Sequence, residues 1–390
     1  MISFDNTEKA FISKSDADLV RSYRLFKIIG NPTFVKLGAV FTPLALSLHL
    51  PIKGIIRKTI YRQFVGGENI EDCNKTIIEL GKFNIGTILD YSVEGKEAES
   101  DFDACCKETI ETIHRAKGDK NIPFCVFKVT GLARFALLEK VSAKQNLSEE
   151  EKTEWNRVRE RVHKICTESH THNKPVFFDA EESWIQQAID DLANENKEKF
   201  NKEKAIVYNT YQLYRHDRFI YLEQCIKHAK ENNYHIGAKL VRGAYMEKER
   251  KRATEMGYTS PIQPDKAGSD KDYDLAVEMC IKNIEHVSIC AGTHNEKSSL
   301  HLVELMQKNN ISPNDTRVYF SQLLGMSDHI SYNLSTAGYN VAKYVPYGPV
   351  KEVLPYLLRR AKENTSVKGQ TGRELALIIK EKARRKKASA

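Results

Sequence analysis

Eight short apolar runs alternate with long amphipathic stretches along most of this 390-residue chain. Each run has the length of a β-strand and precedes a segment with helical spacing, such as 218–233 or 297–310. This alternation predicts a parallel sheet, and eight units favour a closed (β/α)8 barrel over an open doubly wound sheet. The candidate strands are 87–92, 124–130, 175–182, 205–211, 236–243, 287–294, 317–324 and 339–346.

Flanking segments divide the chain into three parts. We expect a helical arm over residues 1–65, a catalytic α/β barrel over 66–363 and a basic extension over 364–390.

Hydrophobic residues (41%) and charged residues (29%) are balanced as in ordinary globular proteins, which excludes disordered and collagen-like classes. The apolar stretch 37–52 is shorter than the about 20 residues that cross a bilayer. We expect it to pack on the domain, with shallow membrane contact as the alternative.

The net charge of +8 is concentrated near the C-terminus, where residues 373–387 hold seven Lys or Arg against two Glu. The body shows no basic face with interleaved aromatic residues, so nucleic-acid binding is not expected. The tail is interpreted as a solvated helix end, or alternatively as a segment attracted to an anionic membrane surface.

Cysteine usage and the N-terminus bear on the compartment. The eight cysteines are scattered without a C-x-x-C pair, which indicates reduced thiols. Acidic residues near the N-terminus (Asp5, Glu8, Asp16 and Asp18) argue against a mitochondrial transit peptide. We therefore expect a cytoplasmic protein, with a peripheral position on the inner face of the membrane as a further option.

Polar or ionisable residues stand at the carboxyl ends of seven predicted strands, which is where barrel enzymes keep their catalytic groups. Such groups need partners when buried, so the set is more informative than any one member. In chain order they are Lys128, Asp179, Asn209, Lys239 and Arg242 followed by Tyr245, then Thr293, His294 and Asn295, then Gln322 and Leu323, and finally Tyr344.

The segment after the eighth strand adds Tyr356, Arg359 and Arg360. On a helix the tyrosine shares a face with both arginines, which diverge by about 100° and can hold one anion from two sides. An exposed arginine pair is the alternative. Together with Lys128 and Tyr344, the pair predicts a clamp for a carboxylate or a phosphate.

Other motifs are weak or missing. No G-x-G-x-x-G follows a strand, and no phosphate-binding P-loop is present. The two histidines of 170–173 are expected at the surface, with a metal site as the alternative, and His294 lacks spaced ligands, so no metal is predicted. The turn-rich stretch 259–270 is interpreted either as a lid over the site or as an ordinary surface loop. A Schiff-base lysine, Lys128 or Lys239, would suit an aldolase-type barrel and is a competing hypothesis.

Seven motifs in order resemble the proline dehydrogenase family over roughly residues 75–370. They are FKVTGLARF, FFDAEES, YNTYQLYRHDR, GAKLVRGAYMEKER, AGTHN, YFSQLLGM and YVPYGPVKEVLPYLLRRAKEN. The resemblance implies a distorted (β/α)8 barrel whose last helix lies over the barrel mouth. It also implies noncovalent FAD and oxidation of L-proline to Δ1-pyrroline-5-carboxylate, with electrons passed to a quinone. Since no aldehyde dehydrogenase domain follows, pyrroline-5-carboxylate dehydrogenase is expected as a separate chain.

The resemblance also implies roles for individual residues. Arg359, Arg360 and Lys128 would hold the proline carboxylate, and Asp179 would pair with these cations. Lys239 would lie near flavin N5, where bifunctional bacterial members have an arginine. The walls of the pyrrolidine pocket would be Tyr245, Leu323, Tyr344 and Tyr356. Other contacts with FAD would come from Asn209 (a glutamine in those members), Arg242, Thr293, His294, Asn295, Gln322 and Glu363. Tyr344 would favour proline over 4-hydroxyproline, and a 4-hydroxyproline dehydrogenase is the alternative within the same fold.

Overall fold

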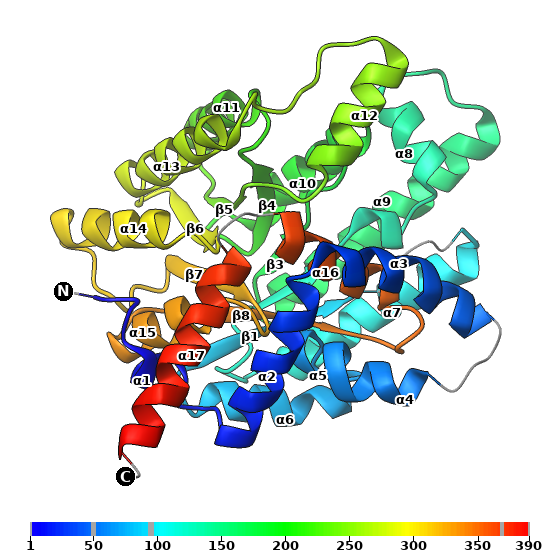
Figure 1. The fold of residues 1–390 in the computed structure, drawn as a ribbon. Helices are drawn as coiled ribbons and strands as arrows, with labels where there is room; N and C mark the ends of the chain where they lie inside the picture. Colours follow the sequence, from blue (N-terminus) through cyan, green and yellow to red (C-terminus); the bar gives the residue numbers. More distant parts are fainter. Residues whose placement is uncertain (1, 48–51, 93–96, 367–369, 389–390) are drawn as a thin grey trace.

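A computed structural model describes residues 2–47, 52–92, 97–366 and 370–388 and confirms the barrel. Eight parallel strands close in chain order, β1 to β8, with β1 also paired to β8 (Figure 1). Every predicted strand is present, with shorter bounds in most cases. The strands are β1 (Ile85–Tyr91), β2 (Phe124–Phe127), β3 (Val176–Phe178), β4 (Val207–Gln212), β5 (Ile236–Val241), β6 (Val287–Gly292), β7 (Val318–Leu323) and β8 (Val341–Tyr347).

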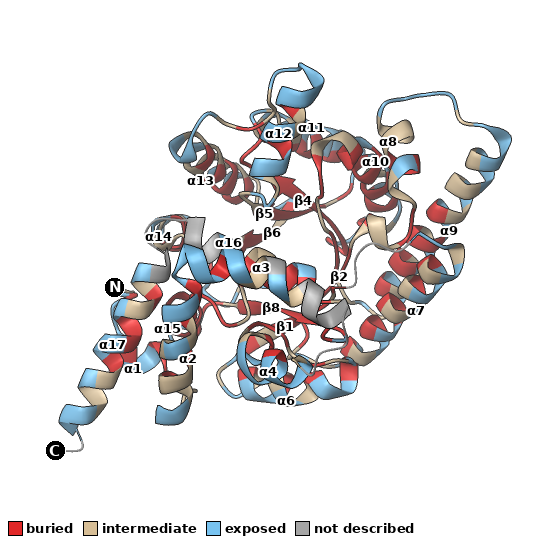
Figure 2. Ribbon diagram, turned by 45° about the vertical axis from the view of Figure 1, so that its right-hand side comes forward, coloured by how far each residue is buried: buried red, intermediate tan, exposed pale blue. Residues whose placement is uncertain are grey.

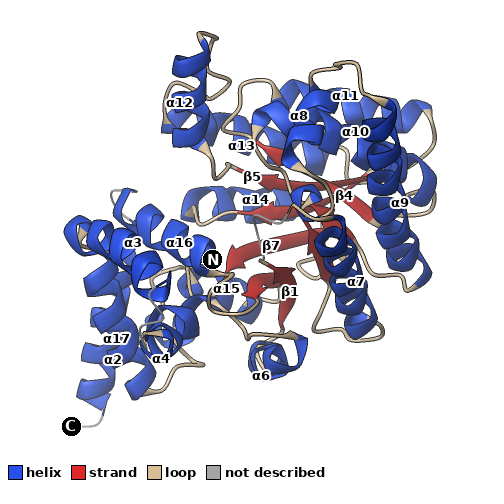
Figure 3. Cartoon of the chain, turned by 90° about the vertical axis from the view of Figure 1, so that its right-hand side faces the viewer, coloured by secondary structure: helices blue, strands red, loops and turns tan. Residues whose placement is uncertain are grey.

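Helical segments follow each strand and surround the sheet (Figure 3). Those of the barrel are α7 (Glu99–Ala116), the 3-10 turn η2 (Val129–Gly131), α8 (Phe135–Ser142), α9 (Glu149–Thr171), α10 (Ser183–Phe200), α11 (Arg218–Glu231), α12 (Met246–Met256), α13 (Lys266–Lys282), α14 (Glu296–Lys308) and α15 (Asp328–Thr336). Before β1 lie α1 (Thr7–Ala10), α2 (Asp16–Ile29), α3 (Pro32–Ser47), α4 (Lys53–Ile56), the π-helix η1 (Arg57–Tyr61), α5 (Arg62–Phe64) and α6 (Ile70–Gly81). After β8 come α16 (Leu354–Ser366) and α17 (Gln370–Ala388).

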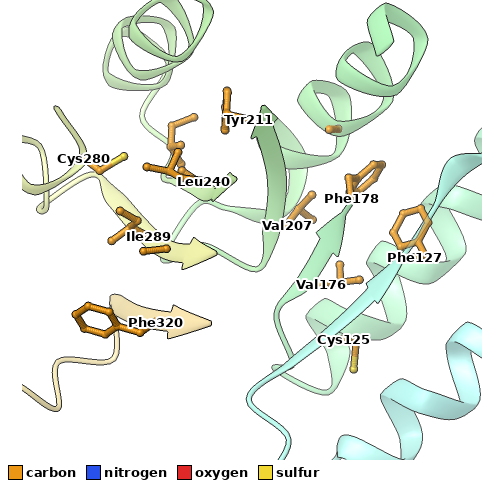
Figure 4. Packing of buried hydrophobic residues seen from close by; sticks show 14 of the residues in the cluster. Cys125, Phe127, Val176, Phe178, Val207, Tyr211, Leu240, Cys280, Ile289 and Phe320 are labelled. Carbon is orange, nitrogen blue, oxygen red and sulfur yellow. The ribbon is translucent and has the colours of Figure 1, made fainter. Parts of the chain in front are cut away.

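Successive side chains of each strand point alternately to the helices and to the barrel interior. Phe178, Val207 and Tyr211 belong to the large core between strands and helices (Figure 4). Their neighbours Phe177 and Tyr208 point inward and meet Phe124, with ring centroids 4.5 Å apart for Phe124–Phe177 and 5.5 Å for Phe124–Tyr208. These rings fill the middle of the barrel, so a ligand site must lie above them, at the carboxyl ends of the strands.

The helix α6 occupies the place beside β1 that a final helix takes in a regular barrel. Its residues Ile77 and Leu80 share the core with Leu89 of β1 and with Val345 of β8. The last barrel helix, α16, instead packs against α2 and α3 (Figure 2). Its residues Tyr356 and Leu357 belong to the same cluster as Leu323 at the carboxyl end of β7. The last helix therefore lies at the barrel mouth, as predicted.

The basic C-terminal segment is folded against the N-terminus. Within α17, Arg373 pairs with Asp5 (2.9 Å), Arg384 with Glu8 (3.5 Å) and Arg385 with Asp16 (2.9 Å). The helix also packs on α2 and α1. The tail is therefore not a solvated helix end, because acidic residues of the arm neutralise part of its charge.

The stretch 37–52 is helical over 37–47, and residues 48–51 lie outside the described ranges. One side of α3 packs on α16, as expected, while Phe34, Leu37 and Phe41 are exposed on the other. Within the described ranges, no helix combines the length and apolarity that crossing a bilayer requires.

Glu381 organises the outer half of α17, and its removal should loosen that helix. Its fully buried carboxylate accepts hydrogen bonds from Arg384 (2.8 Å) and Arg385 (2.7 Å). We expect Glu381→Gln to lower the free energy of unfolding by about 1.5–3 kcal/mol, the usual value of hydrogen bonds to charged groups. Glu79→Gln is the control, because Glu79 forms an exposed pair with Lys75 and should cost less than about 0.5 kcal/mol.

The difference between wild type and Glu381→Gln should shrink in acid. Burial raises the pKa of Glu381, but the hydrogen bonds from Arg384 and Arg385 outweigh it and leave the pKa below its ordinary value. A lowered folded-state pKa stabilises the fold above the ordinary carboxyl range, and this contribution is lost as pH falls through the lowered value. Urea titrations at neutral and acidic pH measure the free energy of unfolding of both proteins. If wild type and Glu381→Gln lose the same free energy between the two pH values, the assignment is contradicted.

Candidate functional site

Four side chains from four neighbouring parts of the sheet meet inside the barrel mouth. The Asp179 carboxylate binds Lys239 (Oδ1 to Nζ, 2.5 Å) and accepts a hydrogen bond from the Tyr344 hydroxyl (2.7 Å). Lys239 also donates to the Tyr344 hydroxyl oxygen (2.8 Å). Lys128 lies 3.8 Å from the second carboxylate oxygen of Asp179. The structure thus brings together four of the predicted residues. Lys128 and Asp179 directly follow β2 and β3, and Lys239 and Tyr344 lie within β5 and β8.

Ionisation in this interior cluster follows from the two lysines. Burial would raise the pKa of Asp179, but Lys239 and Lys128 hold it below its ordinary value. Burial and the charge of Asp179 together raise the pKa of Tyr344. Asp179 therefore stays a carboxylate and Tyr344 a neutral hydroxyl at neutral pH, which gives the cluster a fixed pattern of donors and acceptors.

Asp90, at the end of β1, is a member of this site that the sequence reasoning missed. Its carboxylate lies 3.4 Å from Lys128 Nζ and accepts a hydrogen bond from Ser92 (2.7 Å). The signal was available, since Asp90 is a polar residue at the carboxyl end of a predicted strand. Its pairing with Lys128 emerges only when β1 and β2 lie side by side.

Helix α16 brings the predicted clamp residues to the mouth. Tyr356 and Arg360 are buried, Arg359 is half-buried, and the Arg360 guanidinium lies 5.2 Å from the centre of the Tyr356 ring. Leu323 belongs both to the cluster around α16 and to the barrel interior, so it links the helix to the interior cluster. Tyr245 is half-buried at the start of α12.

A second set of predicted residues forms the rim between β5 and β7. Arg242 donates to Asp270 (2.7 Å), to the Thr293 hydroxyl (2.8 Å) and to Ser298 (2.9 Å). Asn295 caps the N-terminus of α14 by accepting from Lys297 N (2.9 Å) and Ser298 N (3.3 Å). Arg242 and the N-terminal end of α14 are both suited to bind an anion such as a phosphate.

His294 and Gln322 support the same rim. The Nδ1 atom of His294 is 2.9 Å from the Ser327 hydroxyl. Burial, with the charges of Lys343 and Arg360, lowers the pKa of His294 to about 3, so its ring is neutral. Gln322 donates to the Thr293 carbonyl (3.1 Å) and accepts from Ser331 (2.8 Å).

Asn209 lies apart from both sets. Its amide donates to Asp190 of α10 (2.8 Å) and accepts from Thr210 N (2.9 Å). The strand alternation explains this position, because Tyr208 and Thr210 face the interior and Asn209 therefore faces the helices. The side chain of Glu363 lies outside the described part of the chain.

The FAD implied by the resemblance fits this arrangement. A dinucleotide requires hydrogen-bond donors for its phosphates, and Arg242 and its neighbours offer them. Its flavin requires a polar surface, which Lys239 of the same strand region offers. The backbone of Gly243 has φ +135° and packs on Tyr214, so close that a Cβ would lie 2.4 Å from the ring. Only glycine adopts this conformation readily, and it leaves backbone next to Arg242 open to a ligand.

The segment 259–270 borders the rim and is tied to the loop after β4. Gln263 N donates to the Tyr214 carbonyl (2.7 Å), and His216 N donates to the Pro261 carbonyl (3.1 Å). Arg242 also binds Asp270, the last residue of this segment. These bonds make the segment an extension of the mouth wall.

Comparisons with known proteins agree with the fold and the motifs. The family model described as "Proline dehydrogenase" matches residues 73–373. "Proline dehydrogenase 1, mitochondrial" of Dictyostelium discoideum is 31% identical over 97% of this chain and 74% of its own. "Hydroxyproline dehydrogenase" of Xenopus laevis is 29% identical over 96% of this chain and 88% of its own.

A solved structure shows the same architecture. Proline utilization A from Bdellovibrio bacteriovorus, inactivated by N-propargylglycine, superposes with a TM-score of 0.72 at 20% identity. The match covers 94% of this chain but 37% of that longer chain. At this identity the likeness concerns the fold, including the barrel and its flanking helices.

Proposed function

Because the chain belongs to the proline dehydrogenase family, we propose that it oxidises L-proline to Δ1-pyrroline-5-carboxylate, with FAD as the hydride acceptor. It is an oxidoreductase, and the proposal concerns its substrate, its cofactor and the roles of its residues. The observation that carries the proposal is the interior cluster of Lys128, Asp179, Lys239 and Tyr344. Helix α16, which carries the two arginines, packs at the same mouth through Leu323.

The residue types at the mouth suit a substrate with a carboxylate. Lys128 and Lys239 hold Asp90 and Asp179 inside the barrel. Arg359 and Arg360 of α16 carry guanidinium groups, whose paired N–H donors match the geometry of a carboxylate. An amino acid whose carboxylate binds these arginines is oriented with its ring toward Tyr344 and Lys239, and such orientation is a large part of catalysis.

Each part of the site then has a chemical role. Bound FAD supplies the two-electron acceptor. The amine must react in its neutral form, since its nitrogen lone pair drives loss of hydride from C5. Asp179 stays ionised, so it positions Lys239 and Tyr344 and does not act as an acid. The aromatic floor of Phe124, Phe177 and Tyr208 excludes water from below.

The aldolase hypothesis fits this geometry less well. A Schiff-base lysine must offer a neutral amine to a carbonyl group. Both candidate lysines are engaged by carboxylates, Lys239 by Asp179 and Lys128 by Asp90 and Asp179.

The proposed electron acceptor is a membrane quinone, with the arm as the contact. Between Asp18 and Glu68 the chain holds eight Lys or Arg and no acidic residue. Phe34 and Phe41 of α3 are each 58% exposed, and Ile55 of α4 is 65% exposed. Exposed aromatic residues among cations are typical of segments that lie at an anionic bilayer surface.

The test of the function and of the clamp is anaerobic reduction of the bound flavin. The protein should purify with FAD, which L-proline should bleach. Arg359→Met and Arg360→Met should each raise KM for proline at least about 30-fold, because loss of one partner of a buried charge pair costs about 2–5 kcal/mol. FAD content should stay normal. Lys351→Met, an exposed cation before α16, is the control. A flavin that proline does not bleach would refute the function, and wild-type kcat/KM in both arginine variants would refute the clamp.

Tyr344 should set the preference for proline over 4-hydroxyproline. Its ring occupies space that a 4-hydroxyl would need, although size alone excludes an added hydroxyl by only about 100-fold. Tyr344→Ser should narrow the ratio of kcat/KM values, mainly by loss of proline activity. Tyr344→Phe keeps the ring but loses the bond to Asp179, so it should keep the ratio while lowering activity. Wild-type preference for hydroxyproline, or an unchanged ratio in Tyr344→Ser, would rule out this role.

Removal of the exposed rings of α3 should weaken membrane binding without harming the barrel. Phe34→Ser with Phe41→Ser should reduce sedimentation with phosphatidylglycerol vesicles, yet leave proline oxidation with a soluble dye unchanged. The control is Ile220→Ser on α11, which removes an equally exposed (55%) apolar side chain elsewhere. Equal sedimentation of the α3 variant and wild type would show that the exposed rings of α3 do not bind the membrane.

A further inference from the structure

Two histidines and a glutamate meet on the outside of the barrel, on helices α7 and α9. His114 lies in the last turn of α7, Glu168 in the last turn of α9, and His172 directly follows that helix. Their ligand atoms all lie within 4.8 Å of one another. The helices lie side by side and lead into β2 and β3, so this cluster is at the barrel end opposite the mouth (Figure 2).

The distances match the geometry of a metal centre. His114 Nε2 is 3.1 Å, and His172 Nε2 is 3.4 Å, from the same oxygen of Glu168. Ligands about 2.0–2.1 Å from a tetrahedral zinc ion are separated by roughly 3.3–3.4 Å. Two edges of such a tetrahedron are therefore present already. The histidine rings meet edge to face with centroids 5.2 Å apart, and both Nε2 atoms lie near the same oxygen of Glu168.

The surroundings suit a cation that arrives from solution. His114 and Glu168 are 44% and 30% exposed, so the site is accessible, while His172 is held closer at 16%. The other ring nitrogen of His114 lies 4.0 Å from the carboxylate of Glu111, which adds negative charge beside the site. Near their N-terminal halves the same helices are joined by Glu99 with Arg157 (2.9 Å) and by Asp103 with Arg161 (2.8 Å).

We propose that His114, Glu168 and His172 form a binding site for Zn²⁺ or a similar nitrogen-preferring divalent transition metal, with water completing the coordination. Imidazole and carboxylate ligands suit zinc, whereas Ca²⁺ and Mg²⁺ prefer all-oxygen sites. The metal would bridge the two helices where they lead into β2 and β3. Because Lys128 and Asp179 follow the opposite ends of these strands, the ion would stabilise the barrel without touching the substrate.

The test is zinc binding by FAD-loaded protein first stripped with a chelator, measured by competition with a chromophoric chelator. We expect one Zn²⁺ per chain to be bound through this cluster. His172→Ala and His114→Ala should each weaken this binding by more than about 10-fold, since even loss of an outer partner of a metal ligand costs 10–100-fold.

The control is His301→Ala. His301 pairs with Glu278 across two helices (2.9 Å), as His114 does with Glu168, but no second histidine completes that pair. Zinc should raise the melting temperature of wild type and His301→Ala but not of His172→Ala, with proline oxidation unchanged in all three. No zinc binding by wild type, or equal weakening in His301→Ala, would overturn the proposal and leave the cluster as hydrogen bonds to Glu168. Competition by excess Mg²⁺ would contradict the nitrogen-ligand assignment.

Discussion

The carboxylate of Asp179, buried between Lys239, Lys128 and the Tyr344 hydroxyl, is the interaction on which the barrel mouth depends. It connects the ends of four strands that are distant in sequence, and each partner on its own would be a costly buried polar group. A buried ion pair contributes little net stability compared with a hydrophobic substitute. Its value here is positional, since it gives the mouth one arrangement of donors above the aromatic floor.

The second constraint is that α6, which precedes β1, takes the place of the helix that follows β8 in a regular barrel. Because α6 covers the outside of β1, the helix after β8 is free to lie at the mouth, where Tyr356 and Leu357 pack with Leu323. The N-terminal arm then becomes the support of α16, through α2 and α3, and α17 joins the arm through ion pairs with Asp5, Glu8 and Asp16. The N-terminal arm and α17 thus support the position of α16 at the barrel mouth.

Most of the fold could be predicted because its signal is local and repeated. Eight apolar runs, each followed by a helix, leave few topologies, and the polar residues at the strand ends follow from the rule that parallel strands end at one edge. Asn209 shows where this reasoning stops. A strand end contains residues of both faces, and the register that turns Thr210 inward and Asn209 outward is decided by pairing with β5. Asp90 was missed for the related reason that its partner, Lys128, lies on another strand.

The sequence by itself determined the barrel, the strand-end set and the family, because these depend on short-range patterns and ordered motifs. Tertiary structure alone decided which charges meet. The basic tail had the composition of a solvated or membrane-bound segment, yet three of its arginines pair with acids more than 360 positions away. His172 was expected at the surface, and only the packing of α9 on α7 places it beside Glu168 and His114. Such pairings depend on distances in space between segments far apart in the chain, which no local pattern of residues contains.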